Sequence, residues 1–72
     1  MQKNEIARLQ QYLQEKFGNR SIRLSPRKEA GDSVEVMMGE EFIGVIYRDE
    51  DEGDVSYDFN MAILEMDLPP AA

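Results

Sequence analysis

Apolar residues recur along residues 4–17 at the spacing of a helix, and this segment is the first element that the pattern predicts. The stripe is one residue wide, with members three or four positions apart, as expected when one face of a helix packs on a core. It consists of Ile6, Leu9, Leu13 and Phe17. Asn4 is the expected N-cap, and Gly18 is the expected left-handed residue that ends the helix.

Beyond this helix, apolar and polar residues alternate as they do in half-buried strands. We predict four strands, at residues 21–25, 33–38, 41–48 and 54–67. Pro26 should end the first strand or confine it to a sheet edge, because proline cannot donate to a ladder. Gly39 should open a two-residue hairpin turn with positive φ, and the acidic residues 49–53 should form the next loop.

These two turns predict a register in which one face of the sheet is apolar. The predicted cross-strand pairs are Met37–Phe42, Val36–Ile43, Val34–Val45, Tyr47–Val55, Val45–Tyr57 and Ile43–Phe59. The predicted core face carries Val34, Val36, Ile43, Val45, Tyr47, Val55, Tyr57 and Phe59. The predicted far face carries Ser33, Glu35, Ser56, Asp58 and Asn60, together with an apolar cluster of Met37, Phe42 and Ile46.

The end of the last predicted strand changes the phase of its alternation. Apolar residues stand at odd positions up to Ile63 but at even positions in the set Ala62, Leu64, Met66 and Leu68. Such a switch indicates a β-bulge, or a strand that overruns its hairpin and pairs elsewhere in the chain or with a second copy. A short helix from Asn60 is a further alternative. Pro69 and Pro70 should end the structure, leaving residues 69–72 as a disordered tail.

Together these elements predict one α+β domain over residues 1–72, with an N-terminal helix packed on a four-stranded antiparallel β-meander. A chain of 72 residues is close to the size at which one core is only just sufficient. It has no cysteine, so no disulfide can add stability. With a polar N-terminus and no long apolar run, we expect a cytoplasmic protein that does not interact with a membrane.

Charge is distributed unevenly along the chain, whose net charge is −7. Residues 1–31 hold seven Lys or Arg against three Glu, whereas residues 32–72 hold one Arg against twelve acids. The acidic half disfavours nucleic acid as the main partner. Oppositely charged halves can also attract each other between two copies.

The inventory of chemical groups argues against an enzyme. The chain has neither His nor Cys, which removes the commonest general base and the thiol nucleophiles, and no catalytic motif is present. We therefore predict no catalytic residue, no cofactor and no small-molecule substrate.

The acidic residues 49–54 invite a cation hypothesis, with Asp49, Asp51 and Asp54 as weak candidate ligands. The calcium-loop pattern is not met, because position twelve is Asn60 rather than a bidentate Glu. We expect a solvated loop whose charge discourages edge-to-edge association, with weak divalent-cation binding as an alternative.

The basic residues between positions 16 and 28 are a candidate patch for anions or nucleic acid. They include Arg20, Arg23, Arg27 and Lys28. No aromatic residue for stacking on bases is interleaved with them, so nucleic-acid binding stays an alternative rather than the leading prediction.

Two quoted segments carry a resemblance to a known family. The run NEIARLQQYLQEKFGN and the run GEEFIGVIYRDEDEGDVSYDFNMAILEMDL together cover most of residues 4–68. They resemble a family of small, uncharacterised alphaproteobacterial proteins, the domain of unknown function numbered 3126. The resemblance implies a small bacterial cytoplasmic protein, with no activity, cofactor or site residue to carry over.

The leading functional prediction is a non-catalytic protein-interaction module that forms a homodimer or binds another protein. The predicted interaction surface consists of Met37, Phe42, Ile46, Ala62, Leu64, Met66 and Leu68.

Overall fold

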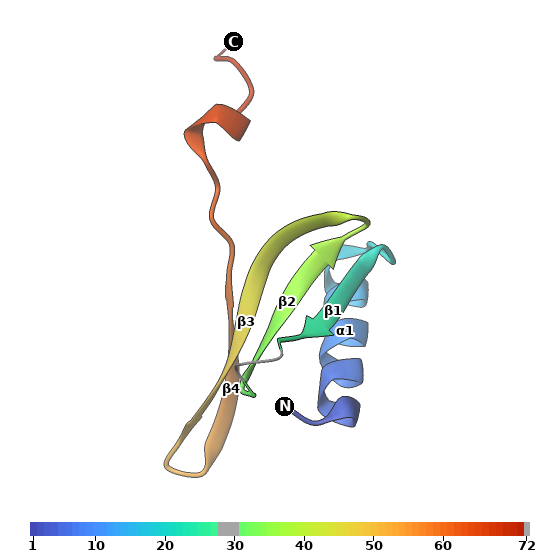
Figure 1. Cartoon of the computed structure of the whole chain (residues 1–72), viewed down its shortest axis with the longest axis vertical. Helices are drawn as coiled ribbons and strands as arrows, with labels where there is room; N and C mark the ends of the chain where they lie inside the picture. Colours follow the sequence, from blue (N-terminus) through green and yellow to red (C-terminus); the bar gives the residue numbers. More distant parts are fainter. Residues whose placement is uncertain (28–30, 72) are drawn as a thin grey trace.

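A computed structural model of the protein describes residues 1–27 and 31–71, and it confirms the predicted α+β fold (Figure 1). One helix lies on one face of a four-stranded antiparallel sheet with the strand order β1-β2-β3-β4. The elements are α1 (Lys3–Phe17), β1 (Ile22–Pro26), β2 (Ser33–Met38), β3 (Glu41–Asp51), β4 (Asp54–Asn60) and a short 3-10 helix η1 (Glu65–Asp67). As predicted, Pro26 lies on an edge strand.

The helix begins earlier than the sequence predicted, because Gln2 rather than Asn4 is its N-cap. The backbone N–H of Gln2 donates to Glu5 Oε1 at 3.2 Å, so a carboxylate in the first turn satisfies a donor that the helix leaves free. At the other end Gly18 has φ 61°, and its N–H donates to the Glu15 carbonyl. This left-handed C-cap confirms the prediction for Gly18.

The core lies between α1 and the part of the sheet formed by β1, β2 and the middle of β3. Its buried residues come from one side of each element, as alternation requires. They are Leu13, Ile22, Leu24, Val34, Val36 and Ile46, with Met1, Ile6, Leu9, Ile43, Tyr57 and Phe59 packed against them. Thus the helix stripe predicted from spacing does face the core, except for Phe17, which is exposed.

The predicted pairing of β2 with β3 is confirmed next to the turn but is wrong farther along the two strands. Met37 pairs with Phe42 as predicted, but Val36 pairs with Gly44 and Val34 with Ile46. Ile43 is the extra residue of a β-bulge, which moves every later residue of β3 to the opposite face. Gly39 has the expected positive φ of 62°.

The predicted loop at residues 49–53 is also wrong. Strand β3 continues to Asp51, which pairs with Asp54, and the turn consists of Glu52 and Gly53 alone. Their φ values of 52° and 86° are both positive, as the tight turns of twisted hairpins require. A left-handed Glu is uncommon, which is why a longer loop was the natural expectation.

Because of these two differences, the side chains of β3 after Ile43 lie on the opposite faces from those predicted, whereas the side chains of β2 and β4 lie on their predicted faces. Tyr57 and Phe59 do face the helix side, where they pair with Arg48 and Ile46. Val45 and Tyr47, predicted in the core, instead lie on the uncovered face of the sheet, which we call the open face. Ile46, predicted on that face, is buried with only 2% exposure.

Gly44 lies close to the last residues of β4. A Cβ atom at this position would lie 2.5 Å from the Asn60 carbonyl oxygen and 2.6 Å from Cε1 of Phe59. The Phe59 ring therefore occupies the space that a side chain at position 44 would need. This contact lies where β4 ends and the chain leaves the sheet (Figure 1).

The strand predicted over residues 54–67 ends at Asn60. The following residues project beyond the sheet, and η1 lies near the tip of this projection (Figure 1). We call residues 61–68 the C-terminal segment. Residues 61–64 form neither an extension of the strand nor a helix from Asn60. The phase switch at Ala62 lies next to the point where the chain leaves the sheet.

Candidate interaction surfaces

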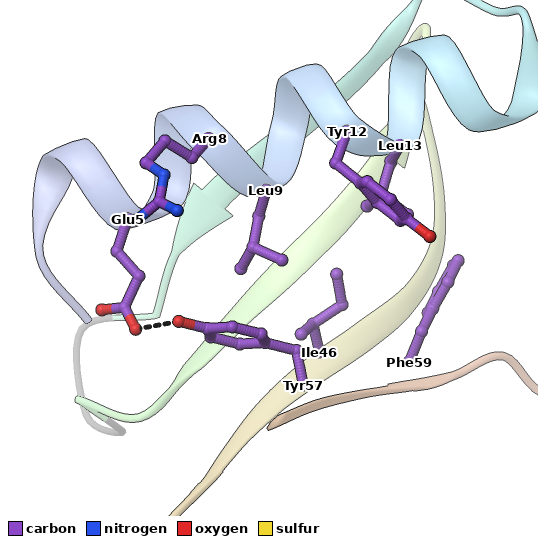
Figure 2. Close-up of a pocket in the computed structure, with 8 residues that line it drawn as sticks. All are labelled: Glu5, Arg8, Leu9, Tyr12, Leu13, Ile46, Tyr57 and Phe59. Atoms are coloured by element: carbon purple, nitrogen blue, oxygen red, sulfur yellow. Dashed lines mark hydrogen bonds between the residues drawn. The ribbon is translucent and has the colours of Figure 1, made fainter. Parts of the chain in front are cut away.

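An apolar groove runs between α1 and the helix-facing side of β3 and β4 (Figure 2). Its volume is about 350 Å³. The helix contributes one wall and the sheet the other, with aromatic side chains from both directed between them. The lining residues are Glu5, Arg8, Leu9, Tyr12, Leu13, Ile46, Tyr57 and Phe59.

The groove exists because α1 packs mainly on β1, at the opposite side of the sheet from β4. A helix is about 10 Å wide and strands are about 4.8 Å apart, so one helix covers about two strands. The side chains of β4 that face the helix side are therefore only partly covered. Tyr57 and Phe59 are half-buried, and Tyr12 on the helix is 58% exposed.

One end of the groove is closed by a polar cluster that joins α1 to β3 and β4. Glu5 Oε2 accepts hydrogen bonds from the Tyr57 hydroxyl (Figure 2) and from Arg48 Nε, the latter at 2.9 Å. Arg48 also forms a looser ion pair with Glu50, at 3.3 Å. The carboxylate that caps the helix thus also fixes the helix to the far strands.

The pKa values of this cluster are displaced away from neutrality. The hydrogen bond from Tyr57, together with those from the Gln2 backbone and Arg48, lowers the pKa of Glu5. The same bond to Glu5, reinforced by desolvation, raises the pKa of Tyr57. A charged carboxylate and a neutral phenol at neutral pH favour a fixed structural contact over proton transfer.

The C-terminal segment exposes large apolar side chains. Each of them is more than half exposed, and Met66 reaches 84%. The exposed members are Met61, Ile63, Leu64, Met66 and Leu68. A concentration of such side chains on a projecting segment is typical of a contact site.

The open face of the sheet carries a second apolar group, formed by Met37, Phe42, Val45 and Tyr47. Phe42 is 53% exposed, whereas Met37 and Val45 are half-buried by their neighbours. Met37 and Phe42 were predicted in this surface and lie opposite each other. Ile46 does not belong to it, since the bulge places its side chain beneath the helix.

A second cleft, of about 470 Å³, lies where β3 and the departing C-terminal segment diverge. It is lined by Phe42, Ile43, Gly44, Val45, Asn60, Met61 and Ala62. This cleft connects the two exposed apolar groups, because Phe42 belongs to one and Met61 to the other.

The structure places the predicted basic residues before β1, within it and directly after it. Arg20, Arg23 and Arg27 are exposed, while Lys28 lies outside the described residues. Arg23 turns back along the chain, and its guanidinium donates to the Arg20 carbonyl at 2.7 Å. Nucleic-acid binding through this region stays a prediction.

The candidate cation ligands lie in a hairpin rather than a loop. Asp49 and Asp51 are in β3, and Asp54 begins β4 opposite Asp51. Among residues 1–27 and 31–71, no three acidic, His or Cys side chains are grouped so that they could hold a metal ion.

Sequence reasoning missed both the groove and its polar cluster. Glu5 lies in the first turn of the helix, but nothing local in the sequence links it to Arg48 or Tyr57. The only signal was the unusual presence of Arg48, the single basic residue within positions 32–72. An isolated cation in an acidic strand is a reasonable candidate for a specific ion pair.

The fold and these surfaces define a small α+β protein with exposed apolar regions. The chain matches the family described as "Protein of unknown function (DUF3126)" over residues 5–67, and it belongs to that family. Comparisons with curated proteins and with solved structures give no match. In the described part of the chain, α1 is too short and too polar to cross a membrane.

Proposed function

We propose that this protein is a non-catalytic interaction module that associates with a second copy of itself in the cytoplasm. The observation that carries this proposal is the C-terminal segment, which holds exposed Leu64 and Met66 away from the body of the domain. Apolar side chains in such a position are costly in water unless a partner covers them.

Two further features support self-association. The open face offers Phe42 beside the base of the segment, so one partner can contact both apolar groups. The basic N-terminal and acidic C-terminal halves of the sequence also complement each other between two copies. In a two-fold dimer each contact occurs twice, which doubles the buried area without further sequence requirements.

The test is the solution mass, measured by light scattering on a sizing column across a dilution series and at two salt concentrations. We expect a dimer for the unmodified chain and monomers for Phe42→Glu and Leu64→Asp, because each substitution places a charge in the apolar contact. Gln11→Glu, on the exposed side of the helix, is the control and should keep the dimer mass. Circular dichroism verifies that the variants fold. An unchanged mass for both Phe42→Glu and Leu64→Asp would contradict the proposal.

A further inference from the structure

We infer that the groove between α1 and β4 receives the C-terminal segment of a second copy, so that two chains exchange these segments reciprocally. The inference rests on the proposed self-association and names the surface that each segment meets. Three independent features of the described residues support it: the direction of the segment, its fit to the groove, and the charge at the groove's rim.

The direction of the segment excludes its own groove. After Asn60 the chain continues outward from the end of β4, away from α1 (Figure 1). To reach its own groove it would have to reverse immediately, but residues 61–64 contain no Gly, Pro, Asn or Asp, the residues that favour tight turns. The groove of another copy is open to it without a reversal.

The length and side chains of the segment suit the groove. From Glu5 to Leu13 the helix wall is about 12 Å long, at a rise of about 1.5 Å per residue. An extended chain covers that distance in about four residues, at about 3.3 Å each. Leu64 is extended, but Met66 lies in η1, where the rise is only about 2 Å per residue, so residues 63–68 are needed to span the length over which Leu9, Tyr12 and Phe59 line the groove.

The charge at the rim favours an acidic occupant. Arg8 lines the groove, and within residues 1–27 and 31–71 it has no ion-pair partner. Glu5, the acidic residue that lines the groove, already accepts hydrogen bonds from Arg48 and Tyr57. The C-terminal segment carries Glu65 and Asp67 and no basic residue, so its acids can pair with Arg8 while its apolar side chains enter the groove.

The absence of cysteine from the sequence makes a direct test straightforward. One chain carries Tyr12→Cys in the groove, a second carries Leu64→Cys, and the two are mixed and oxidised gently. We expect a disulfide-linked heterodimer to form at least about tenfold faster than with Gln11→Cys, because Gln11 is exposed on α1 outside the groove. A chain carrying both substitutions reports on its own groove: an internal disulfide in a monomer would overturn the inference.

A charge exchange provides the second test. Arg8→Glu should weaken the dimer about tenfold, and Glu65→Lys with Asp67→Lys should do the same. Combining all three substitutions should restore at least part of the affinity, a result that a general loss of stability cannot produce. Lys16→Glu makes the same charge change on α1 outside the groove and is the matched control.

The outcomes separate this inference from the proposed function. A chain that is monomeric at every concentration contradicts both. A dimer that survives Arg8→Glu and gives no preferential Tyr12–Leu64 crosslink overturns only the exchange, and shows that the copies meet elsewhere, with the open face around Phe42 as the remaining candidate. Rapid crosslinking together with recovery in the charge-exchanged variant establishes the exchange.

Discussion

The two halves of the sheet use the same alternation of apolar and polar residues but differ in what covers them. In β1 and β2, the central residues facing the helix side are buried, as Leu24 and Val36 illustrate. In β4 the corresponding residues stay partly open, and Val55 is 41% exposed. The difference comes from the width of a single helix, which reaches about two strands. Alternation in a strand therefore indicates that one face needs a partner, but it does not indicate whether that partner belongs to the same chain.

Strand β3 joins these two halves of the sheet. Ile46 belongs to the buried core, whereas Arg48, two residues later on the same face, reaches Glu5 and shares it with Tyr57. Gly44, on the other side of Ile46, admits the ring of Phe59. These residues of β3 connect the covered half to the uncovered one. Four experiments test the comparison, from the largest expected effect to the smallest.

The largest contrast is expected from the same substitution in the two halves. Val36→Lys buries an ammonium group at a site with 0% exposure, and should lower the free energy of unfolding by more than about 3 kcal/mol. Residue 55 lies opposite Glu50 at a partly open site, so Val55→Lys should change the free energy of unfolding by less than about 0.5 kcal/mol. Urea denaturation followed by circular dichroism measures both. Equal losses would show that the β4 side is also buried in solution.

Gly44→Ala tests the contact between β3 and β4. The new Cβ atom would meet the Asn60 carbonyl and the Phe59 ring closer than 3.0 Å, so one of them must move. We expect a loss of about 1–3 kcal/mol in the free energy of unfolding, the usual cost of overpacking. Gly31→Ala is the control, because a Cβ atom there has no neighbour within 4 Å. A neutral Gly44→Ala would mean that β4 can shift freely on β3.

Tyr57→Phe removes the hydroxyl that joins β4 to the start of the helix. It should lower the free energy of unfolding by about 1 kcal/mol, the net value of a typical hydrogen bond. Tyr47→Phe makes the identical change on the open face and should have little effect. Chemical denaturation compares the two variants. If they behave alike, the Glu5–Tyr57 contact does not stabilise the fold in solution.

The smallest effect is expected from Glu5→Gln, whose amide oxygen still accepts from Tyr57. The substitution should cost about 0.5 kcal/mol at pH 7, as expected for a partly exposed ion pair. Because the pKa of Glu5 is lowered below 4.5 on folding, its contribution is present above the unfolded-state pKa and is lost as pH falls through the folded-state pKa. The difference between the two proteins should therefore shrink below about pH 4.5. A constant difference down to pH 2 would contradict the lowered pKa.

The contribution of Tyr57 to the free energy of unfolding depends on pH in the opposite direction. Its pKa is raised above 10.0, so its contribution is present below that value and is lost as pH rises through the folded-state pKa. The contact is thus complete across the neutral range, in keeping with a structural role.

Much of the fold could be predicted from local patterns, whereas the candidate site could not. The helix stripe, the helix cap at Gly18, the hairpin turn at Gly39 and the edge position of Pro26 all follow from backbone preferences that act within a few residues. The face of β3 could not be predicted, because a bulge at Ile43 and a left-handed Glu52 each change the register by an amount that the alternation alone does not record. For that reason Ile46 and Tyr47 exchanged their expected places.

The sequence by itself determined that one helix would cover one face of a four-stranded meander, and that the alternation of apolar residues changes phase near Ala62. Its alternation and turn residues act locally, so they are readable one element at a time. Only the tertiary structure decided which half of the sheet the helix covers, that Glu5 meets Arg48 and Tyr57, and that a groove stays open beside β4. Those outcomes depend on the width of a helix, the twist of strands and contacts between residues far apart in the chain, and these quantities exist only once the elements pack together.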